Sequence, residues 1–396
     1  MATQFHNISS EESISKPETD SGVADGVQAA PLQTTDVGTV QEGACYSVLS
    51  ERQKIALCLA ASLAAIIAPF SANIYYPAIH TLAQDLDVSV SKINLTVSSF
   101  QIFQGLGPFI TAALSETYGR RMGYLVCLAV YAAANLALAL QNSYPALLVL
   151  RILQSSGSSG TLVITQALVA DIATRAERGR YIAFATMGFS LGPALGPVVG
   201  GLFSQYLGWR AIFWFLLGLG AIVMLIMLVF IRETCRSIVG DGSVPPPKWG
   251  RTLVQVLSPD SFLPNHQSLE KPRTTVTPLR ALQLLTSKVN LIVVLYGGFA
   301  YAGYVSITVT LSSQLHARYG YSDVITGVCY LAISLGSLSS FLTSAALTDW
   351  NFKREAKKQG VTVVKKQQTD IRNFDIERAR LAVVFPMLFL ACGIAA

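Results

Sequence analysis

The stretch LGPALGPVVGG, residues 191–201, places two prolines and four glycines inside an apolar run that continues on both sides. Glycines recur every four residues here, at Gly188, Gly192, Gly196 and Gly200. On a helix they share one face and let another helix approach closely. Pro193 and Pro197 each remove a backbone donor, so the helix should bend and neighbours should satisfy the freed carbonyls. Together with Gly201, this stretch predicts a tightly packed, kinked span inside a bundle, acting as a sliding contact or simply as ordinary helix packing.

The composition around this stretch is that of a membrane protein. Hydrophobic residues make up 52% of the 396 residues and charged residues 13%, whereas soluble domains carry roughly 25% charged residues. A helix needs about 20 apolar residues to cross a bilayer. We therefore predict an all-α membrane protein with nine spans, near 55–77, 93–114, 122–140, 146–170, 181–204, 211–231, 289–312, 324–347 and 380–396.

Lysine and arginine concentrate in every second linker between these spans. Linkers that follow even-numbered spans hold 22 of the 29 basic residues, and linkers that follow odd-numbered spans hold three. The positive-inside rule then predicts that the amino terminus and the even-numbered linkers are cytosolic. The net charge of +6 therefore reflects membrane orientation, and we expect no nucleic-acid partner.

A polar, Gly/Pro-rich segment divides the chain after the sixth span. We predict four regions: a disordered cytosolic tail (1–50), a six-span bundle (51–231), a cytosolic linker (232–288) and a partial second bundle of about three spans (289–396). TAALSETYGRR (111–121) and SAALTDWNFKR (344–354) share a pattern 233 residues apart. This similarity predicts two duplicated halves, as in many secondary transporters, although membrane-end sequences also converge by chance.

Several motifs, in order, resemble the major facilitator superfamily. They include FSANIYYPAI (70–79), LSETYGRR (114–121), LRILQSSGSSG (150–160), DIATRAERGR (171–180), GWRAIFWF (208–215) and RETCRSIVGDGSVPPPKW (232–249). The resemblance is to the fungal drug/proton antiporters with twelve spans, and among them to the quinidine-resistance-like group. It implies the major facilitator fold, with a six-helix amino-terminal bundle and an incomplete carboxyl-terminal bundle that lacks the last three spans. Ala112, Glu116 and Arg232 depart from the residues usual in these motifs.

A polar stripe runs along the predicted fourth span. Its members fall at steps of three and four and share one helical face: Arg151, Gln154, Ser158, Thr161 and Thr165. A basic residue inside a span usually faces a cavity and indicates a transport pathway, although near a span end it can also extend to the interface. By resemblance, Arg151 and Gln154 match an Arg-x-x-Gln motif whose arginine is associated with proton coupling.

Further polar and aromatic residues lie on other spans, and they complete the predicted substrate and proton pathway. These are Asn73, Gln101, Tyr301 and Tyr304. A site of aromatic rings and uncharged polar groups suits amphipathic organic molecules. Each of these residues taken singly also fits a packing or interface position.

Charges at the predicted cytosolic ends of the spans form a candidate latch. Opposite charges there can pair across helices and separate as the cytosolic side opens, although solvated pairs contribute only about 0–1 kcal/mol. By resemblance the members are Glu116, Arg120, Arg121 and Asp171, with Asp349 and Arg354 as an echo in the second half.

The function that we predict is secondary active transport, namely proton-coupled efflux of a drug, toxin or secondary metabolite by alternating access. The alternatives are a facilitator or importer of a small nutrient, and a shortened relative or sensor that transports nothing. The expected partners are the bilayer, a small organic substrate and the proton, with no obligate protein partner. The expected location is the plasma membrane, or else a vacuolar or other internal membrane. We expect no enzymatic activity, metal or cofactor, because the four histidines are isolated and phosphate-binding and metal-site motifs are absent.

Overall fold

The computed structural model describes residues 47–174, 177–247, 250–251 and 286–358. The chain divides into two units, Met1–Ala44 and Cys45–Ala396, and every described residue lies in the second. Most of the predicted tail (1–50), much of the predicted linker (232–288) and the whole predicted ninth span (380–396) fall outside the described residues.

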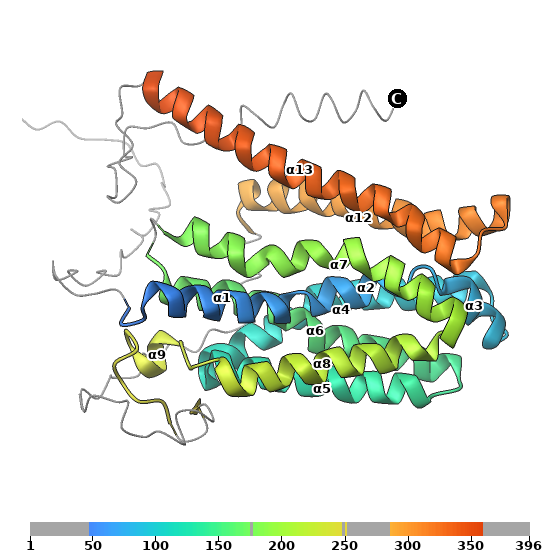
Figure 1. The fold of residues 1–396 in the computed structure, drawn as a ribbon, viewed down its shortest axis with the longest axis horizontal. Helices are drawn as coiled ribbons and strands as arrows, with labels where there is room; N and C mark the ends of the chain where they lie inside the picture. Colours follow the sequence, from blue (N-terminus) through green and yellow to red (C-terminus); the bar gives the residue numbers. More distant parts are fainter. Residues whose placement is uncertain (1–46, 175–176, 248–249, 252–285, 359–396) are drawn as a thin grey trace, which may run out of the picture. The chain divides into compact units, whose positions relative to one another are not determined.

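The described residues form an all-helical structure, which confirms the predicted fold class (Figure 1). The elements, with gaps in the numbering, are α1 (Glu51–Ala65), α2 (Ile67–Asn73), α3 (Ile79–Asp85), α4 (Val90–Tyr118), α5 (Arg120–Leu140), α6 (Tyr144–Ile172), α7 (Arg178–Leu207), α8 (Arg210–Phe230), α9 (Arg236–Val239), α12 (Lys288–Tyr319) and α13 (Asp323–Lys358).

Six segments of the described chain are long and apolar enough to cross a membrane: Glu51–Asn73, Arg120–Leu140, Tyr144–Ile172, Arg178–Leu207, Arg210–Phe230 and Asn290–Tyr319. The predicted second span is not among them. α4 has 29 residues but carries Asn94, Ser98 and Gln101 within its length, and such polar side chains lower its hydropathy. The predicted eighth span lies within α13, whose apolar part among the described side chains is Asp323–Gly336. Hydropathy alone is a poor criterion for helices that line an interior.

The first span begins earlier than its hydropathy predicts. Ser50 and Gln53 form a capping box at the start of α1, in which each side chain accepts a hydrogen bond from the backbone nitrogen of the other. Such a cap satisfies donors that a helix start leaves free. The helix is interrupted at Ile66, because Pro69 has no N–H to donate to the Ala65 carbonyl. α2 continues the span to Asn73.

The core of the amino-terminal helices lies around α6, which packs extensively against α4 and α5. α7 packs against α1 and α2, and it also packs against α13 (Figure 1). α7 therefore makes the most extensive contact between the amino-terminal helices and α13.

The glycines of α7 lie where neighbouring backbone approaches most closely. A methyl group at Gly188 would overlap the carbonyl oxygen of Ser62, and one at Gly200 would overlap that of Ile74. A methyl group at Gly201 would instead overlap the carbonyl of Asp323, at the start of α13. The glycines that recur every four residues thus face α1, α2 and Ile74, while Gly201 faces the opposite neighbour.

The prolines of α7 do not end the helix, which continues through both. Pro197 cannot donate to the carbonyl of Pro193 four residues earlier. The hydroxyl of Ser334, on α13, donates to that carbonyl at 2.9 Å. A neighbouring helix therefore supplies the hydrogen bond that the proline removes, as a bilayer interior requires.

The predicted internal repeat agrees with the start of α13 but not with its end. α13 begins at Asp323, 233 residues after Val90 begins α4. α4 ends before Gly119, whose φ of +102° suits glycine. The corresponding position is Phe352, and α13 continues through it to Lys358. The first half turns at glycine, whereas the second half has no glycine there and stays helical. The duplication itself stays a prediction.

Candidate functional site

A cavity of about 300 Å³ lies between the amino-terminal helices and the pair α12 and α13. Its lining combines aromatic rings with uncharged polar groups and holds no charged side chain among the described residues. The lining includes the predicted residues Asn73, Gln101, Tyr301 and Tyr304, and also Tyr76, Gln104, Phe189, Ser190, Pro193 and Ser334. The structure thus brings together four of the six residues predicted for the pathway.

Hydrogen bonds and ring contacts order several of the lining side chains. Asn73 Nδ2 donates to the Pro69 carbonyl at 2.6 Å, which holds its amide against its own helix. Gln101 Nε2 donates to the Tyr76 hydroxyl at 3.5 Å. The ring centroids of Tyr301 and Tyr304 are 6.2 Å apart.

One polar atom of this lining is left with an unused hydrogen-bonding capacity. Gln101 Oε1 is buried and accepts no hydrogen bond from any described residue. A second cavity, of about 520 Å³ between α4 and α12, shares Gln101 and Tyr301 with the first. Gln101 therefore lies where both cavities meet, and its side-chain oxygen is unpaired there.

Arg151 does not line either cavity. Its side chain is 1% exposed, so it does not extend to the membrane interface. The centre of its guanidinium lies 4.2 Å from the ring centroid of Tyr75 and 4.3 Å from that of Phe100. Aromatic faces attract cations, and the attraction strengthens when water is excluded. The two rings thus stabilise the positive charge of Arg151 on the interior face of α6.

A polar network continues from this arginine into α5 and α2. Arg151 Nη1 donates to Gln154 Oε1 at 2.7 Å, and Gln154 Nε2 donates to Asn135 Oδ1 at 2.7 Å. Asn135 Nδ2 donates to the Tyr131 carbonyl at 2.8 Å, and the Tyr131 hydroxyl lies 2.7 Å from Ser71 Oγ. Sequence reasoning missed Asn135, although a lone amide inside an apolar span is itself a signal of an interior position.

No described carboxylate pairs with Arg151. Its Nε and Nη2 atoms are buried and have no hydrogen-bond partner among the described residues. Two N–H groups of the Arg151 guanidinium are therefore unpaired, and the network beside them is made only of neutral groups.

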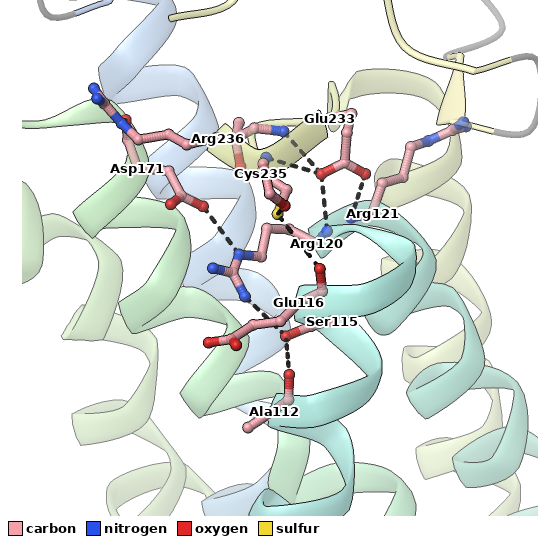
Figure 2. Close-up of polar contacts among 11 residues, drawn as sticks. Ala112, Ser115, Glu116, Arg120, Arg121, Asp171, Glu233, Cys235 and Arg236 are labelled. Atoms are coloured by element: carbon pink, nitrogen blue, oxygen red, sulfur yellow. Dashed lines mark hydrogen bonds and ion pairs between the residues drawn. The ribbon is translucent and has the colours of Figure 1, made fainter. Parts of the chain in front are cut away.

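A second cluster lies at the end of the bundle where α4 turns into α5 (Figure 2). Arg120 Nε pairs with Asp171 Oδ2, near the end of α6, at 2.9 Å. Arg120 Nη1 also donates to Ser115 Oγ at 3.0 Å. The structure thus brings together Arg120 and Asp171, two members of the predicted latch.

Glu233 joins this cluster, and sequence reasoning missed it. Its carboxylate accepts from the backbone nitrogens of Arg120 (2.8 Å) and Arg121 (3.3 Å) at the start of α5, and from those of Thr234 and Cys235 (Figure 2). A helix start leaves its first N–H groups unpaired and carries a partial positive charge. Glu233 therefore caps α5 from 113 residues away in sequence. The motif that begins at Arg232 contains this glutamate, but its position in the sequence gives no indication of a partner on α5.

The other predicted latch residues make different contacts. Arg121 donates to the carbonyls of Leu228 (2.7 Å) and Arg251. Glu116 is exposed, and its carboxylate shows no hydrogen bond or ion pair to a described residue. Arg354 is exposed and lies over the ring of Trp350, 5.3 Å from its centroid. The side chain of Asp349 lies outside the described part of the structure.

Long apolar helices around an uncharged cavity, with charges gathered at one end, define a membrane protein of the transporter class. The family comparison makes this assignment specific. Residues 61–394 match the Major Facilitator Superfamily, and the chain belongs to that superfamily. It is a family of transporters and not of enzymes, as the sequence predicted.

The curated relatives are fungal. The chain is 53% identical to an MFS-type transporter of a Phoma species over 366 residues, which cover 92% of this chain and 70% of that protein. It is 54% identical to MFS-type transporter clz19 of Cochliobolus lunatus, with 88% of this chain and 66% of that protein covered. It is 31% identical to a multidrug transporter of Candida glabrata, with 82% and 56% covered.

A solved structure shows the same fold. A bacterial homologue of the human lysosomal transporter Spinster, in an inward-facing and unoccupied conformation, gives a TM-score of 0.55 at 17% identity. The match covers 78% of this chain and 64% of that chain. The similarity confirms the major facilitator fold. The chain thus spans 56–70% of the length of these related proteins.

Proposed function

We propose that this chain belongs to a secondary active transporter that exports small organic molecules in exchange for protons by alternating access. The observation that carries the proposal is the uncharged cavity between the amino-terminal helices and the pair α12 and α13. In transporters of this kind, a site between two helical groups opens to either side as the groups rock against each other.

The chemistry of the cavity defines the class of substrate. Tyrosine rings supply flat apolar surface, and the amides of Asn73, Gln101 and Gln104 supply hydrogen bonds without charge. Such sites bind amphipathic molecules, because the rings bury the apolar part while a few polar groups set the orientation. Fungal secondary metabolites and drugs of moderate size fit this description.

The helix α7 is proposed as the sliding contact. Its glycine face lets α1 and α2 approach to backbone distance, while its opposite side meets α13 through Gly201 and through the Ser334 hydrogen bond. Small residues leave no long side chains interlocked between the helices, which lets their backbones approach closely. A bend of α7 at Pro193 and Pro197 belongs to this proposal.

Arg151 is proposed as a residue of the proton pathway. The charge is buried among neutral groups, so protonation changes near it alter its environment strongly in a region of low dielectric. We further propose that Glu116, Arg120 and Asp171 form a cytosolic latch that weakens as that side opens, with Arg121, Asp349 and Arg354 as accessory charges. The location proposed is the plasma membrane, with the amino terminus cytosolic.

Vesicle transport tests the proposal. The full-length protein is reconstituted in liposomes with an imposed pH gradient, and the movement of a panel of radiolabelled amphipathic aromatic compounds is followed. We expect accumulation on the acidic side that collapses when a protonophore is added. Movement down the substrate gradient alone, indifferent to pH, would indicate a facilitator. Absence of movement for every compound would favour a sensor.

A pair of variants connects the result to the cavity. Gln101→Leu removes the unpaired carbonyl oxygen at the junction of the two cavities, and we expect KM to rise about tenfold while Vmax changes little, as loss of one hydrogen bond to substrate implies. Gln166→Leu, at an exposed position of α6 that belongs to neither lining, is the control and should leave KM unchanged.

A further inference from the structure

Two histidines from opposite groups of helices stack against each other at one end of the molecule. His80, on α3, and His316, in the last turn of α12, have ring centroids 4.0 Å apart and an interplanar angle of 24°. Both side chains are half-buried. His316 Nδ1 also lies 3.1 Å from the Tyr321 carbonyl in the turn that leads to α13.

The start of α13 reinforces this junction. Asp323 Oδ2 accepts hydrogen bonds from Thr81 Oγ1 at 2.6 Å and from Ser204 Oγ at 2.5 Å. The Val324 nitrogen donates to Gln205 Oε1 at 3.1 Å. Residues of α3, α7, α12 and α13 therefore meet here, at the end opposite to the cluster of Arg120 and Asp171. The positive-inside rule predicts that this end faces outward.

The groups that act on the His80 charge come from both neighbouring helices. Burial lowers the pKa of His80, the imidazole of His316 lowers it further, and the carboxylate of Asp323 raises it. Of the other charges near this end, Asp85 on α3 accepts from the Trp209 indole at 2.8 Å. Arg318 on α12 and Lys92 on α4 are not among the groups that shift the pKa of His80.

We propose that His80 and His316 are the site at which protons from the outer side bind and release the outer junction. With both imidazoles neutral, the rings stack and the junction stays closed. Asp323 compensates the first proton that binds. A second proton would place two positive charges 4.0 Å apart, and their repulsion separates α3 from α12.

The direction of the pH effect follows from the lowered pKa of His80. A histidine whose pKa is lower in the closed junction than in the open one binds fewer protons when closed. The closed junction is therefore fully stable above the ordinary histidine pKa of about 6.5 and loses stability as the pH falls through that value. This inference rests on the proposed function, because an exchanger that takes up protons needs a site at which protons bind from the outer side.

Distance measurement between spin labels tests the proposal without substrate. Labels are attached to cysteines introduced at Gln84 on α3 and Ala317 on α12, both exposed, in full-length protein whose native cysteines are replaced. We expect a longer distance component to grow as the pH falls from about 7.5 to about 5.0, on either side of the ordinary histidine pKa. Each additional proton that the open state binds changes the open-to-closed ratio by at most about tenfold per pH unit, so the wild-type slope should exceed the slope of a variant that keeps only one of the two histidines.

Three variants separate the proton effect from packing. His80→Phe and His316→Phe each keep an aromatic stack but remove one proton-binding group. The open-to-closed ratio should then change by at most about tenfold per pH unit. The double variant should stay closed at every pH. Tyr319→Phe, in the stacked Tyr319–Tyr321 pair whose centroids are 5.3 Å apart, is the control and should behave like wild type.

Two outcomes overturn this inference: no change in the wild-type distance across this pH range, or a double variant that keeps the wild-type response. Its failure is distinguishable from failure of the proposed function. If the junction opens at low pH but transport does not depend on the pH gradient, the inference is supported and proton exchange is refuted. If transport is coupled to protons but the junction distance does not change with pH, the inference is refuted and proton exchange is supported.

Discussion

The carboxylate oxygen of Glu233 and the backbone nitrogen of Arg120 are 2.8 Å apart, although 113 residues separate them in sequence. This contact ties the segment after α8 to the start of α5. It also accounts for the glycine before Arg120, because a methyl group at Gly119 would overlap the Glu233 carboxylate. The Glu233 cap on α5 therefore requires a residue without a side chain at position 119.

Glu233→Gln should destabilise the protein. The substitution removes the negative charge from the positive end of α5 and turns one of two accepting oxygens into a donor that faces backbone N–H groups. We expect a loss of about 1–2 kcal/mol, measured by thermal or denaturant unfolding in detergent. Glu116→Gln, at an exposed carboxylate nearby, should change stability by less than about 0.5 kcal/mol. Equal effects of the two substitutions would contradict the capping role.

Gly119→Ala should be more damaging than the same change at another glycine with positive φ. At Gly119, φ is +102° and the Glu233 carboxylate fills the space for a side chain; at Gly208, φ is +82° and no atom lies within 4 Å. Both variants incur backbone strain of about 1–3 kcal/mol, because their φ and ψ angles fall in a region that is essentially open only to glycine. Only Gly119→Ala also displaces the cap, so it should lose about 1–2 kcal/mol more than Gly208→Ala. Equal unfolding midpoints for the two variants would refute the steric argument.

Gly188→Ala should loosen the packing of α7 on α1. A methyl group there would overlap the Ser62 carbonyl oxygen, and overpacking of a close contact costs about 1–3 kcal/mol. Gly218, on α8, is exposed, and no atom lies within 4 Å of the place that a β-carbon would take there; alanine at that position should be neutral or slightly stabilising. Thermal unfolding of both variants provides the measurement, and a stable Gly188→Ala protein would argue against backbone-distance packing.

Ser334→Ala should weaken the contact between α7 and α13. The change leaves the half-buried Pro193 carbonyl without the hydrogen bond that Ser334 donates, and loss of one such bond costs about 0.5–1.5 kcal/mol. Ser313→Ala is the matched control, because the Ser313 hydroxyl on α12 has no partner among the described residues. Unfolding in detergent should show a loss only for Ser334→Ala. A loss of the same size in both would mean that serine packing, not this bond, matters.

Much of the architecture was readable from local patterns. Apolar runs of span length predicted the helices, and the four-residue spacing of glycines predicted which face of α7 others would approach. The register of Arg151 and Gln154 predicted an interior face for α6. These inferences succeed because they depend on periodicity along one helix, which the chain carries in its own order.

Most contacts between distant segments were not readable in this way. Nothing local pairs Glu233 with Arg120, places His80 on His316, or sets the ring of Tyr75 against Arg151. The predicted latch shows the limit of motif position: Arg120 and Asp171, both predicted members, pair in the structure, whereas the Glu116 carboxylate is exposed. Which side chains meet depends on how helices cross, and helix crossing depends on the packing of all of them together.

The sequence by itself determined the class of this protein, most of its described helices and the interior face of α6, because a bilayer allows few backbone structures and penalises every misplaced charge. The tertiary structure alone decided that Asn73, Gln101, Tyr301 and Tyr304 line one cavity, that Arg151 lies apart from it between two rings, and that two histidines meet at one end of the bundle. Those relationships join residues on separate helices, and only close packing in three dimensions brings them within contact distance.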